Sequence, residues 1–337
     1  MSEYDKSVKV QKVVAGKFRR YNHLSKLQHL TIPSIILPNI RDLILVIFGV
    51  GQSLFRMVLW RPDVIFAKGG YVCLPVGVAA WALGIPVVIH DSDSRPGLTN
   101  KLMAPRAKRI ATGMPLDNYE YPKSKTTYVG TPVSPDYREI SDKKRSEIKE
   151  GLGFEPSRPM TLITGGGQGA KSINDNVVRH LGEILNHTNV VLVSGSAQYD
   201  EINSLVPQDD PRFILKDFVS SGMSDLVCGA DLVISRAGAT TLLELAAAAR
   251  PTIVIPSKRL VWQIEHVRSY ENTDAVLVLD EDKFDDPDDN SLVVAIKKIL
   301  NDKKYGDRLS RNLHKHAKPN AASEMAQIII ESANGRA

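Results

Sequence analysis

The sequence predicts an α/β protein built from parallel sheets with helices on both faces. Short apolar runs of strand length alternate with amphipathic stretches of helical length, which is the rhythm of repeated β-α-β units. The 337 residues are enough for about two domains. A polar, charged and proline-marked stretch from Pro132 to Pro159 separates two series of runs. We therefore expect the boundary between two sheets in that stretch.

Residues 1–70 are basic and contain one long apolar stretch. They hold 11 Lys and Arg against 4 Asp and Glu, a net charge of +7 in a chain whose total is +5. The stretch Leu43–Phe55 has thirteen uncharged residues, fewer than the ~20 that a membrane-spanning helix needs. It is either a core helix or a helix lying on an anionic membrane surface, which the basic residues would favour. Because aromatic residues are 6% of the chain and no RNA- or DNA-binding motif occurs, nucleic acid is not an expected partner.

The first sheet is predicted from four apolar runs. They are Val64–Ala67, Pro86–Ile89, Arg109–Ala111 and Thr127–Val129. The second of them ends at a titratable cluster that contains His90, Asp91 and Asp93. A general base is expected at such a strand end, so these side chains are candidates for it. His90 has an alternative role, which is to cap a turn through a hydrogen bond.

The second sheet is predicted from six further runs. They are Met160–Ile163, Val190–Val193, Arg212–Leu215, Asp231–Ser235, Thr252–Ile255 and Ala275–Val278. Helical patterns lie between them, and the last helices are expected from Leu292 to about Ser332. The acidic stretch Asp280–Asp289 is interpreted as a solvated loop. Ligands of parallel sheets bind at the carboxyl ends of the strands, so we expect ligand-binding residues in the loops that follow these runs.

A glycine-rich turn follows the first of these six runs. Four of the five residues from Gly165 to Gly169 are glycine, and a helix is predicted from Ala170 to Leu185. Glycine permits positive φ and close backbone approach to a ligand. The unpaired N–H groups and the positive dipole end of the helix that follows favour a diphosphate. The alternative is a tight strand-to-helix turn without a ligand.

Two more strand ends face the same edge of the predicted sheet. After Ser235 the chain turns at Gly238, and a helix begins near Thr240 with Glu244 one turn further on. Glu244 is either a solvated helix-surface carboxylate or a partner for a ribose diol. The loop Pro256–Gln263 is the third. No Asp-x-Asp pair or carboxylate cluster follows any of these three strand ends, so we expect neither a catalytic metal nor another cofactor.

Several short motifs occur together in a characteristic order. They are Gly69-Gly70-Tyr71, Gly84–His90, Gly97–Lys101, Val129–Val133, Gly165–Ala170 and Arg236–Ala239 with Glu244. As a set, from about Ala67 to Gln263, the chain resembles the MurG family, the N-acetylglucosaminyltransferases that form lipid II. The resemblance implies a GT-B fold, in which two Rossmann-like parallel-sheet domains face a cleft. The implied parts are an N-terminal domain at 1–135, a linker at 136–158, a UDP-sugar domain at 159–318, and a helix at 319–337 that packs back on the first domain.

The same resemblance implies the activity. N-acetylglucosamine would move with inversion from UDP-N-acetylglucosamine to the muramoyl 4-hydroxyl of undecaprenyl-linked lipid I. The enzyme would be a peripheral protein at the cytoplasmic face of an anionic membrane. Two other functions stay open: another nucleotide-sugar:lipid glycosyltransferase of GT-B fold, and a non-catalytic subunit that needs a partner chain.

The resemblance also implies which residues form the site. For UDP-N-acetylglucosamine these are Asp93, Ser134, Gly166, Gly167, Gln168, Val219, Ala239, Thr240, Thr241, Leu242, Leu243, Glu244 and Gln263. On the acceptor side they are Gly69, Gly70, Tyr71, Thr99 and Asn100. Within this set Glu244 would bind the ribose hydroxyls, Gln263 the sugar hydroxyls, and Val219 the uracil through its backbone. Gly167, Asp93 and Ser134 stand where the family has Ser, Asn and Arg, which points to a divergent lineage or an altered choice of donor.

One family element is missing from the sequence. The family opens with a strand and a Gly-Gly-Thr-Gly-Gly-His loop, whose histidine is a candidate base. We expect that this chain has a truncated N-terminal domain, that a separate chain supplies the loop, or that the chain is inactive. Without that loop, His90 and Asp91 are the catalytic candidates.

Overall fold

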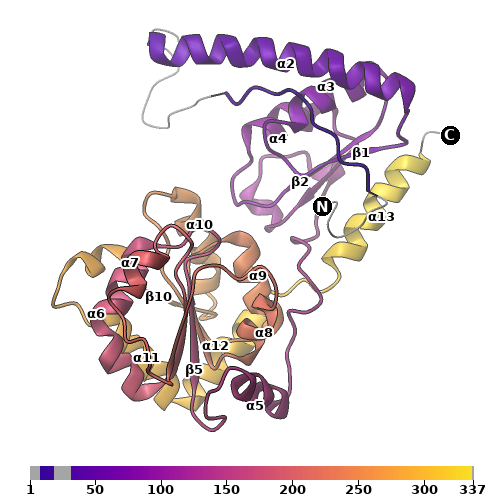
Figure 1. The fold of residues 1–337 in the computed structure, drawn as a ribbon. Coiled ribbons are helices and arrows are strands. Elements are labelled where there is room, and N and C mark those ends of the chain that lie inside the picture. Colours follow the sequence, from indigo (N-terminus) through magenta and orange to yellow (C-terminus); the bar gives the residue numbers. More distant parts are fainter. Residues whose placement is uncertain (1–7, 19–31, 336–337) are drawn as a thin grey trace. The chain divides into compact units, whose positions relative to one another are not determined.

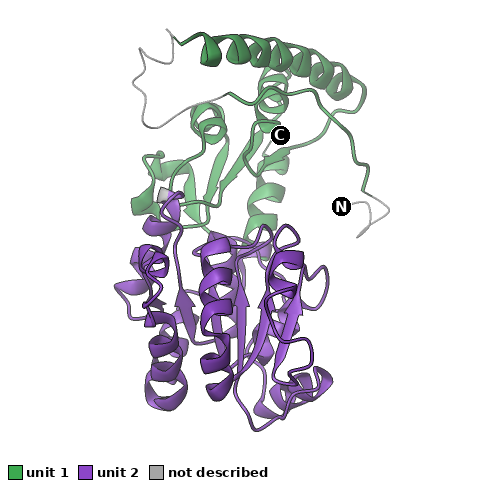
Figure 2. Cartoon of the chain, turned by 60° about the vertical axis from the view of Figure 1, so that its left-hand side comes forward, with its two compact units in different colours: residues 1–130, 323–337 green, residues 131–322 purple. Residues whose placement is uncertain are grey.

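The computed structural model describes residues 8–18 and 32–335 and divides the chain into two units (Figure 2). Unit 1 consists of residues 1–130 and 323–337, and unit 2 of residues 131–322. Each unit has its own parallel sheet and its own buried apolar cluster. Four of the basic residues counted above lie outside the described residues. They are Lys6, Arg19, Arg20 and Lys26.

Unit 1 is built on a four-stranded parallel sheet of order β1-β2-β3-β4. The strands are β1 (Ile65–Ala67), β2 (Val87–Asp91), β3 (Arg109–Thr112) and β4 (Thr126–Tyr128). The helices are α2 (Pro33–Leu59), α3 (Cys73–Ala82), α4 (Leu98–Met103) and α13 (Ala321–Asn334), with short 3₁₀ turns at Ala104–Arg106, Leu116–Asn118 and Lys123–Lys125. Strand β2 is buried along its whole length and extends to Asp91, so His90 and Asp91 belong to the strand and do not follow it.

Helix α2 is twice as long as the uncharged stretch Leu43–Phe55 because it continues through Arg41 and Arg56 at the two ends of that stretch. By length and composition it could cross a membrane, although 28% of its most apolar window is buried within the protein. One stripe, which includes Val46 and Met57, packs toward α3 and the sheet. Residues 8–18 run beside α2 (Figure 1), and Arg56 donates a hydrogen bond of 2.7 Å to the Lys12 carbonyl.

The C-terminal helix completes unit 1. Met325 of α13 forms a buried cluster with Ala111 of β3 and with Val129. The Lys108 ammonium group donates hydrogen bonds to the carbonyls of Ser332 and Gly335, both at 3.1 Å. The chain therefore leaves unit 1 after residue 130 and returns to it at residue 323.

Unit 2 has a six-stranded parallel sheet of order β10-β9-β8-β5-β6-β7. The strands are β5 (Met160–Thr164), β6 (Asn189–Val193), β7 (Phe213–Lys216), β8 (Leu232–Ser235), β9 (Thr252–Val254) and β10 (Leu277–Val278). The α-helices are α5 (Asp142–Gly151), α6 (Lys171–His187), α7 (Tyr199–Asn203), α8 (Met223–Gly229), α9 (Ala239–Ala248), α10 (Val261–Glu271), α11 (Ser291–Asn301) and α12 (Lys303–His314). Helices cover both faces of the sheet (Figure 1).

The strand order reverses between β5 and β8. Strand β6 lies on one side of β5 and β8 lies on the other, so the chain moves in opposite directions from the central strand. In register, Thr164 at the end of β5 pairs with Ser235 at the end of β8. Such a switch point leaves a crevice at the carboxyl ends of the two strands, and ligands of open α/β sheets bind there.

Two segments differ from their sequence-based interpretation. Residues 136–158 carry α5, whose Lys149 is buried and lies 2.6 Å from the Asp231 carboxylate, so this stretch packs as part of unit 2. The acidic stretch Asp280–Asp289 is mostly exposed, as expected of a solvated loop, but it also contains a 3₁₀ helix, η4 (Glu281–Asp285), whose Phe284 is buried. Hydrophobic burial and an ion pair hold it against the sheet.

Candidate functional site

The glycine turn after β5 presents the start of α6 to the crevice of unit 2. Gly169 has a φ of +73°, and a Cβ there would lie 2.1 Å from the Ser194 carbonyl oxygen, so only glycine fits. Ala170 at the N-cap has no side chain that could bond the first-turn N–H groups of α6. These donors, together with the positive end of the helix dipole, form a seat for an anion.

A second helix starts at the neighbouring strand end. Helix α9 begins at Ala239, and its N-cap Gly238 also offers no capping side chain. Because β5 and β8 are adjacent in the sheet, the N-termini of α6 and α9 lie at the same switch point. Ala239 and Thr240 are in the first turn of α9, where N–H groups have no partner inside the helix.

Glu244 lies on the wall of a cavity of 180 Å³. Gly166, Gly167, Val219 and Thr241 line the same cavity, so the structure brings together five residues that the sequence placed in one site. Glu244 is half-buried, and in the part of the chain that the structure describes no hydrogen-bond or ion-pair partner occupies its carboxylate. Burial raises the pKa of Glu244 to about 7, so it is not the solvated surface carboxylate of the alternative interpretation.

Sequence reasoning missed Tyr137, which lines the same cavity. Burial and, secondarily, the charge of Glu244 raise the pKa of Tyr137 to about 12, so its phenol stays protonated at neutral pH. Tyr137 lies in the segment interpreted as a linker, and no local pattern marks it. Only the packing of residues 131–158 on the sheet brings it to Glu244.

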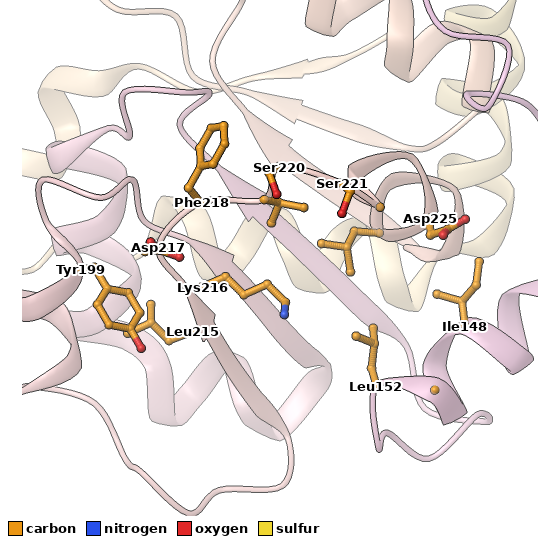
Figure 3. A pocket seen from close by; sticks show the side chains of 14 residues that line it. Ile148, Leu152, Tyr199, Leu215, Lys216, Asp217, Phe218, Ser220, Ser221 and Asp225 are labelled. Carbon is orange, nitrogen blue, oxygen red and sulfur yellow. The ribbon is translucent and has the colours of Figure 1, made fainter. Parts of the chain in front are cut away.

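A larger cavity of 780 Å³ lies at the same strand ends. Gly167, Gln168 and Gln263 line it together with the start of α6. Gln263 is buried, and its side-chain oxygen accepts a hydrogen bond of 2.9 Å from the Ser257 N–H, which fixes the loop after β9. Phe218 and Val219 line both the 180 Å³ cavity and a third cavity of 530 Å³. Figure 3 shows this third cavity, with Phe218, Ser220 and Ser221 on its wall.

Six residues that the family resemblance assigned to the donor do not line these cavities, and two of them, Ala239 and Thr240, lie in the first turn of α9. Leu242 and Leu243 have buried side chains, at most 3% exposed, that belong to the core of unit 2. Ser134 is exposed, and its hydroxyl bonds the Asp136 carboxylate at 2.9 Å. Asp93 belongs to unit 1, where it lines a different cavity.

That cavity of unit 1 measures 410 Å³ and contains the predicted acceptor residues. They are Gly69, Gly70, Tyr71, Thr99 and Asn100. Asp91 and Asp93 line it at the end of β2, and Gly16, Lys17 and Phe18 close it from the N-terminal segment. Gly69 and Gly70 both have a φ of +85°, a conformation that side chains rarely adopt.

His90 has no free nitrogen for a substrate proton. It is fully buried, its Nε2 lies 2.9 Å from the Gly130 carbonyl oxygen, and its Nδ1 lies 3.1 Å from the Ser92 hydroxyl. Burial lowers the pKa of His90, which favours the neutral ring. This geometry matches the turn-capping alternative for His90.

Asp91 is the carboxylate that faces the 410 Å³ cavity from the strand. The Tyr121 hydroxyl donates a hydrogen bond of 2.8 Å to its Oδ2, and Tyr119 stacks on Tyr121 with ring centroids 5.7 Å apart. Burial raises the pKa of Asp91 to about 6, against the opposing effect of the Tyr121 hydrogen bond. A pKa between that of a free carboxylate and neutrality suits a general base.

No metal site accompanies either cavity within residues 8–18 and 32–335. No group of three or more His, Cys, Asp and Glu side chains there could hold a metal ion.

Two family models match the chain. The glycosyltransferase family 28 N-terminal domain matches residues 8–112, and the C-terminal domain of that family matches residues 160–325. A UDP-N-acetylglucosamine–N-acetylmuramyl-(pentapeptide) pyrophosphoryl-undecaprenol N-acetylglucosamine transferase of Clostridium botulinum is 34% identical over 277 residues, 81% of this chain and 73% of the relative. A transferase of the same name from Bacillus thuringiensis is 31% identical over 300 residues, 88% of this chain and 80% of the relative.

Solved structures share the fold. Acinetobacter baumannii MurG matches with a TM-score of 0.67 at 23% identity, over 86% of this chain and 79% of that one. A UDP-GlcNAc 2-epimerase from Neisseria meningitidis matches with a TM-score of 0.62 at 12% identity, over 85% of this chain and 81% of that one. Together with the two parallel sheets, these likenesses confirm the predicted GT-B architecture.

Proposed function

The chain belongs to the MurG-type family of undecaprenol-linked N-acetylglucosamine transferases, and from this membership we infer that it makes lipid II. It transfers N-acetylglucosamine from UDP-N-acetylglucosamine to the 4-hydroxyl of the muramoyl group of lipid I. The observation that carries the proposal is the identity of 34% with a transferase of that name across 81% of the chain. The product serves peptidoglycan synthesis.

We propose that unit 2 holds the donor. The 180 Å³ cavity receives the uridine, with Glu244 accepting hydrogen bonds from the ribose hydroxyls and Val219 near the base. The diphosphate lies at the N-termini of α6 and α9, and the sugar extends into the 780 Å³ cavity toward Gln263. When the bond between the sugar C1 and the diphosphate breaks, negative charge grows on UDP, and the two helix N-termini stabilise it.

We propose that the 410 Å³ cavity of unit 1 holds the muramoyl end of the acceptor and that Asp91 is its base. The acceptor oxygen bonds to C1 as the bond to UDP breaks, and its proton passes to the Asp91 carboxylate. His90 has a structural role, because its hydrogen bonds to Gly130 and Ser92 fix the end of β2, where Asp91 lies. The pKa of about 6 leaves Asp91 mostly ionised at neutral pH.

We propose that α2 places the protein on the cytoplasmic face of the membrane as a peripheral protein. A stripe of large apolar side chains on α2 is exposed. It includes Leu37, Ile40, Ile44, Ile47, Phe48, Phe55, Val58 and Leu59, and Trp60 follows it. The opposite stripe is buried, so α2 lies along a surface more readily than across it. The net positive charge of residues 1–70 favours anionic lipids.

The proposed function is tested by transfer with purified chain, lipid I in anionic vesicles and a panel of UDP-sugars. We expect lipid II from UDP-N-acetylglucosamine and little product from UDP-glucose or UDP-galactose, as measured by chromatography of the labelled lipid. Transfer to diacylglycerol but not to lipid I would replace this proposal with a different lipid glycosyltransferase. Asp91→Asn should abolish transfer while leaving UDP affinity unchanged, since Asp91 belongs to the acceptor side.

A further inference from the structure

A single carboxylate joins the strand-end loops of unit 2. Glu281, the first residue of η4, accepts hydrogen bonds at Oε1 from the Ser172 hydroxyl and from Arg236 Nη2, both at 2.5 Å. Its other oxygen, Oε2, accepts from the Lys258 backbone N–H at 3.2 Å. These partners come after β5, after β8 and after β9 respectively, and Glu281 itself follows β10. The acidic residue therefore ties together three loops from neighbouring strands.

The Arg236–Glu281 ion pair at the centre of these contacts is largely shielded from solvent. The side chains of Arg236 and Glu281 are 13% and 18% exposed. Arg236 also donates to the Ser172 hydroxyl at 2.9 Å and to the Ile255 carbonyl at 3.1 Å. Charge-assisted bonds of this kind are about twice as strong as neutral ones, and burial makes them sensitive to the loss of one partner.

These contacts all border the cavity proposed for the diphosphate and sugar. Ser172, Arg236, Lys258 and Glu281 line the 780 Å³ cavity, and none of them lines the 180 Å³ cavity proposed for the uridine. Ser172 lies in the first turn of α6, whose N–H groups face the crevice. Three donors already occupy Glu281, and Arg236 neutralises its charge beside an anion site. Its role is therefore to hold other groups, not to touch the substrate.

We propose that Glu281 is a positioning residue of the donor site, which fixes the first turn of α6 relative to the loops after β8 and β9 and so sets the affinity for the diphosphate. This inference rests on the proposed function, because it takes a nucleotide diphosphate as the ligand of unit 2. Preorganised N–H donors bind an anion tightly only while their spacing is held. Loss of the Glu281 hydrogen bonds should weaken binding of the diphosphate and leave binding of the nucleoside unchanged.

The experiment compares UDP and uridine binding by calorimetry on the full chain. Glu281→Ala should weaken UDP binding by about tenfold or more, the effect of losing charge-assisted hydrogen bonds. Glu281→Gln keeps one acceptor oxygen and should be intermediate. Ser172→Ala, which removes two hydrogen bonds and no charge, should weaken UDP binding less than Glu281→Ala. Uridine affinity should be unchanged in all three. In turnover, the KM for the donor should rise while the KM for lipid I stays constant.

Glu183→Gln is the matched control. Glu183 is a carboxylate of α6 with its side chain 47% exposed; it pairs with the Lys297 ammonium group at 2.7 Å and lines none of the cavities described above. We expect UDP binding of this variant to stay within about twofold of the wild type. Equal or tighter UDP binding by Glu281→Ala, or an equal loss for UDP and uridine, would overturn the positioning role. Absence of UDP binding by the wild-type chain would instead overturn the proposed function, so the two failures are distinguishable.

Discussion

Glu244 is half-buried in its cavity with a pKa raised to about 7, so it is largely neutral below that pH. Ribose hydroxyls donate to the ionised carboxylate, which means that binding lowers this pKa and releases a proton. UDP affinity should therefore rise by up to about tenfold from pH 6 to pH 8 and level off above. Glu244→Gln should weaken UDP binding at pH 8 by about 1–3 kcal/mol and leave only the pH dependence of the UDP phosphate itself, whose second pKa is about 6. Calorimetry at several pH values measures both, and an unchanged profile would exclude Glu244 from the ribose site.

The hydrogen bond from Tyr121 to Asp91 leads to a second prediction for single residues. The Tyr121 hydroxyl stabilises the ionised carboxylate, so Tyr121→Phe should raise the pKa of Asp91 above its present value of about 6. The acidic limb of the pH profile of kcat/KM should then move upward by as much as about one pH unit. Tyr119→Phe is the control, because the Tyr119 hydroxyl bonds the Asp93 carbonyl at 2.7 Å and not the carboxylate. A limb that stays in place in Tyr121→Phe would show that Asp91 is not the base.

Among single residues, the sequence predicts the site residues that belong to a local motif. It does not predict those whose contacts lie far along the chain. The sequence predicts the Gly166–Gly167 turn and Glu244 because a strand, glycines and the start of a helix follow one another directly, and the two line one cavity. Tyr137 and Glu281 were missed because their partners lie far along the chain, and an acidic run resembles a solvated surface until its contacts are known. Leu242 was assigned by position in a motif, although an apolar side chain beside a helix start also fits a core.

At the scale of elements, helix α2 has one apolar stripe that is exposed and another that is buried. Phe48 and Phe55 are 66% and 69% exposed, so Phe48→Ser and Phe55→Ser should weaken flotation with anionic vesicles and leave the free energy of unfolding within about 0.5 kcal/mol of the wild type. The buried Met57 is the contrast: Met57→Ala should lower the free energy of unfolding by about 2–5 kcal/mol and leave vesicle binding unchanged. Flotation equal to the wild type after both serine substitutions would exclude this stripe as the membrane contact.

How well a helix or strand can be predicted from the sequence depends on whether its own residues or its tertiary contacts determine its ends. Buried strands such as Met160–Thr164 are predicted within a residue or two, because continuous apolar runs leave few alternatives. The uncharged run Leu43–Phe55 marks only the middle of α2, because the helix also includes Arg41, Asp42 and Arg56. Asp42 is buried in α2, and hydropathy alone would not place it there.

At the scale of the whole molecule, unit 2 is one continuous segment with its own core. The proposed donor residues from Gly166 to Gln263 lie inside it, so residues 131–322 alone should fold and bind UDP with an affinity close to that of the full chain. Circular dichroism and thermal melting test folding of the fragment, and calorimetry tests binding. A fragment that folds but does not bind UDP, while the full chain does, would mean that unit 1 contributes to the donor site.

The return of α13 to unit 1 has a consequence for the order of events on the ribosome. Domains generally fold as units as they emerge, with the N-terminal one first. Here Met325 is needed to cover Ala111 and Val129, and Lys108 finds its carbonyl partners only near residue 335. The first domain to be synthesised is thus the last to be completed, and a stalled or shortened nascent chain would carry a finished unit 2 together with a unit 1 whose apolar face is still open.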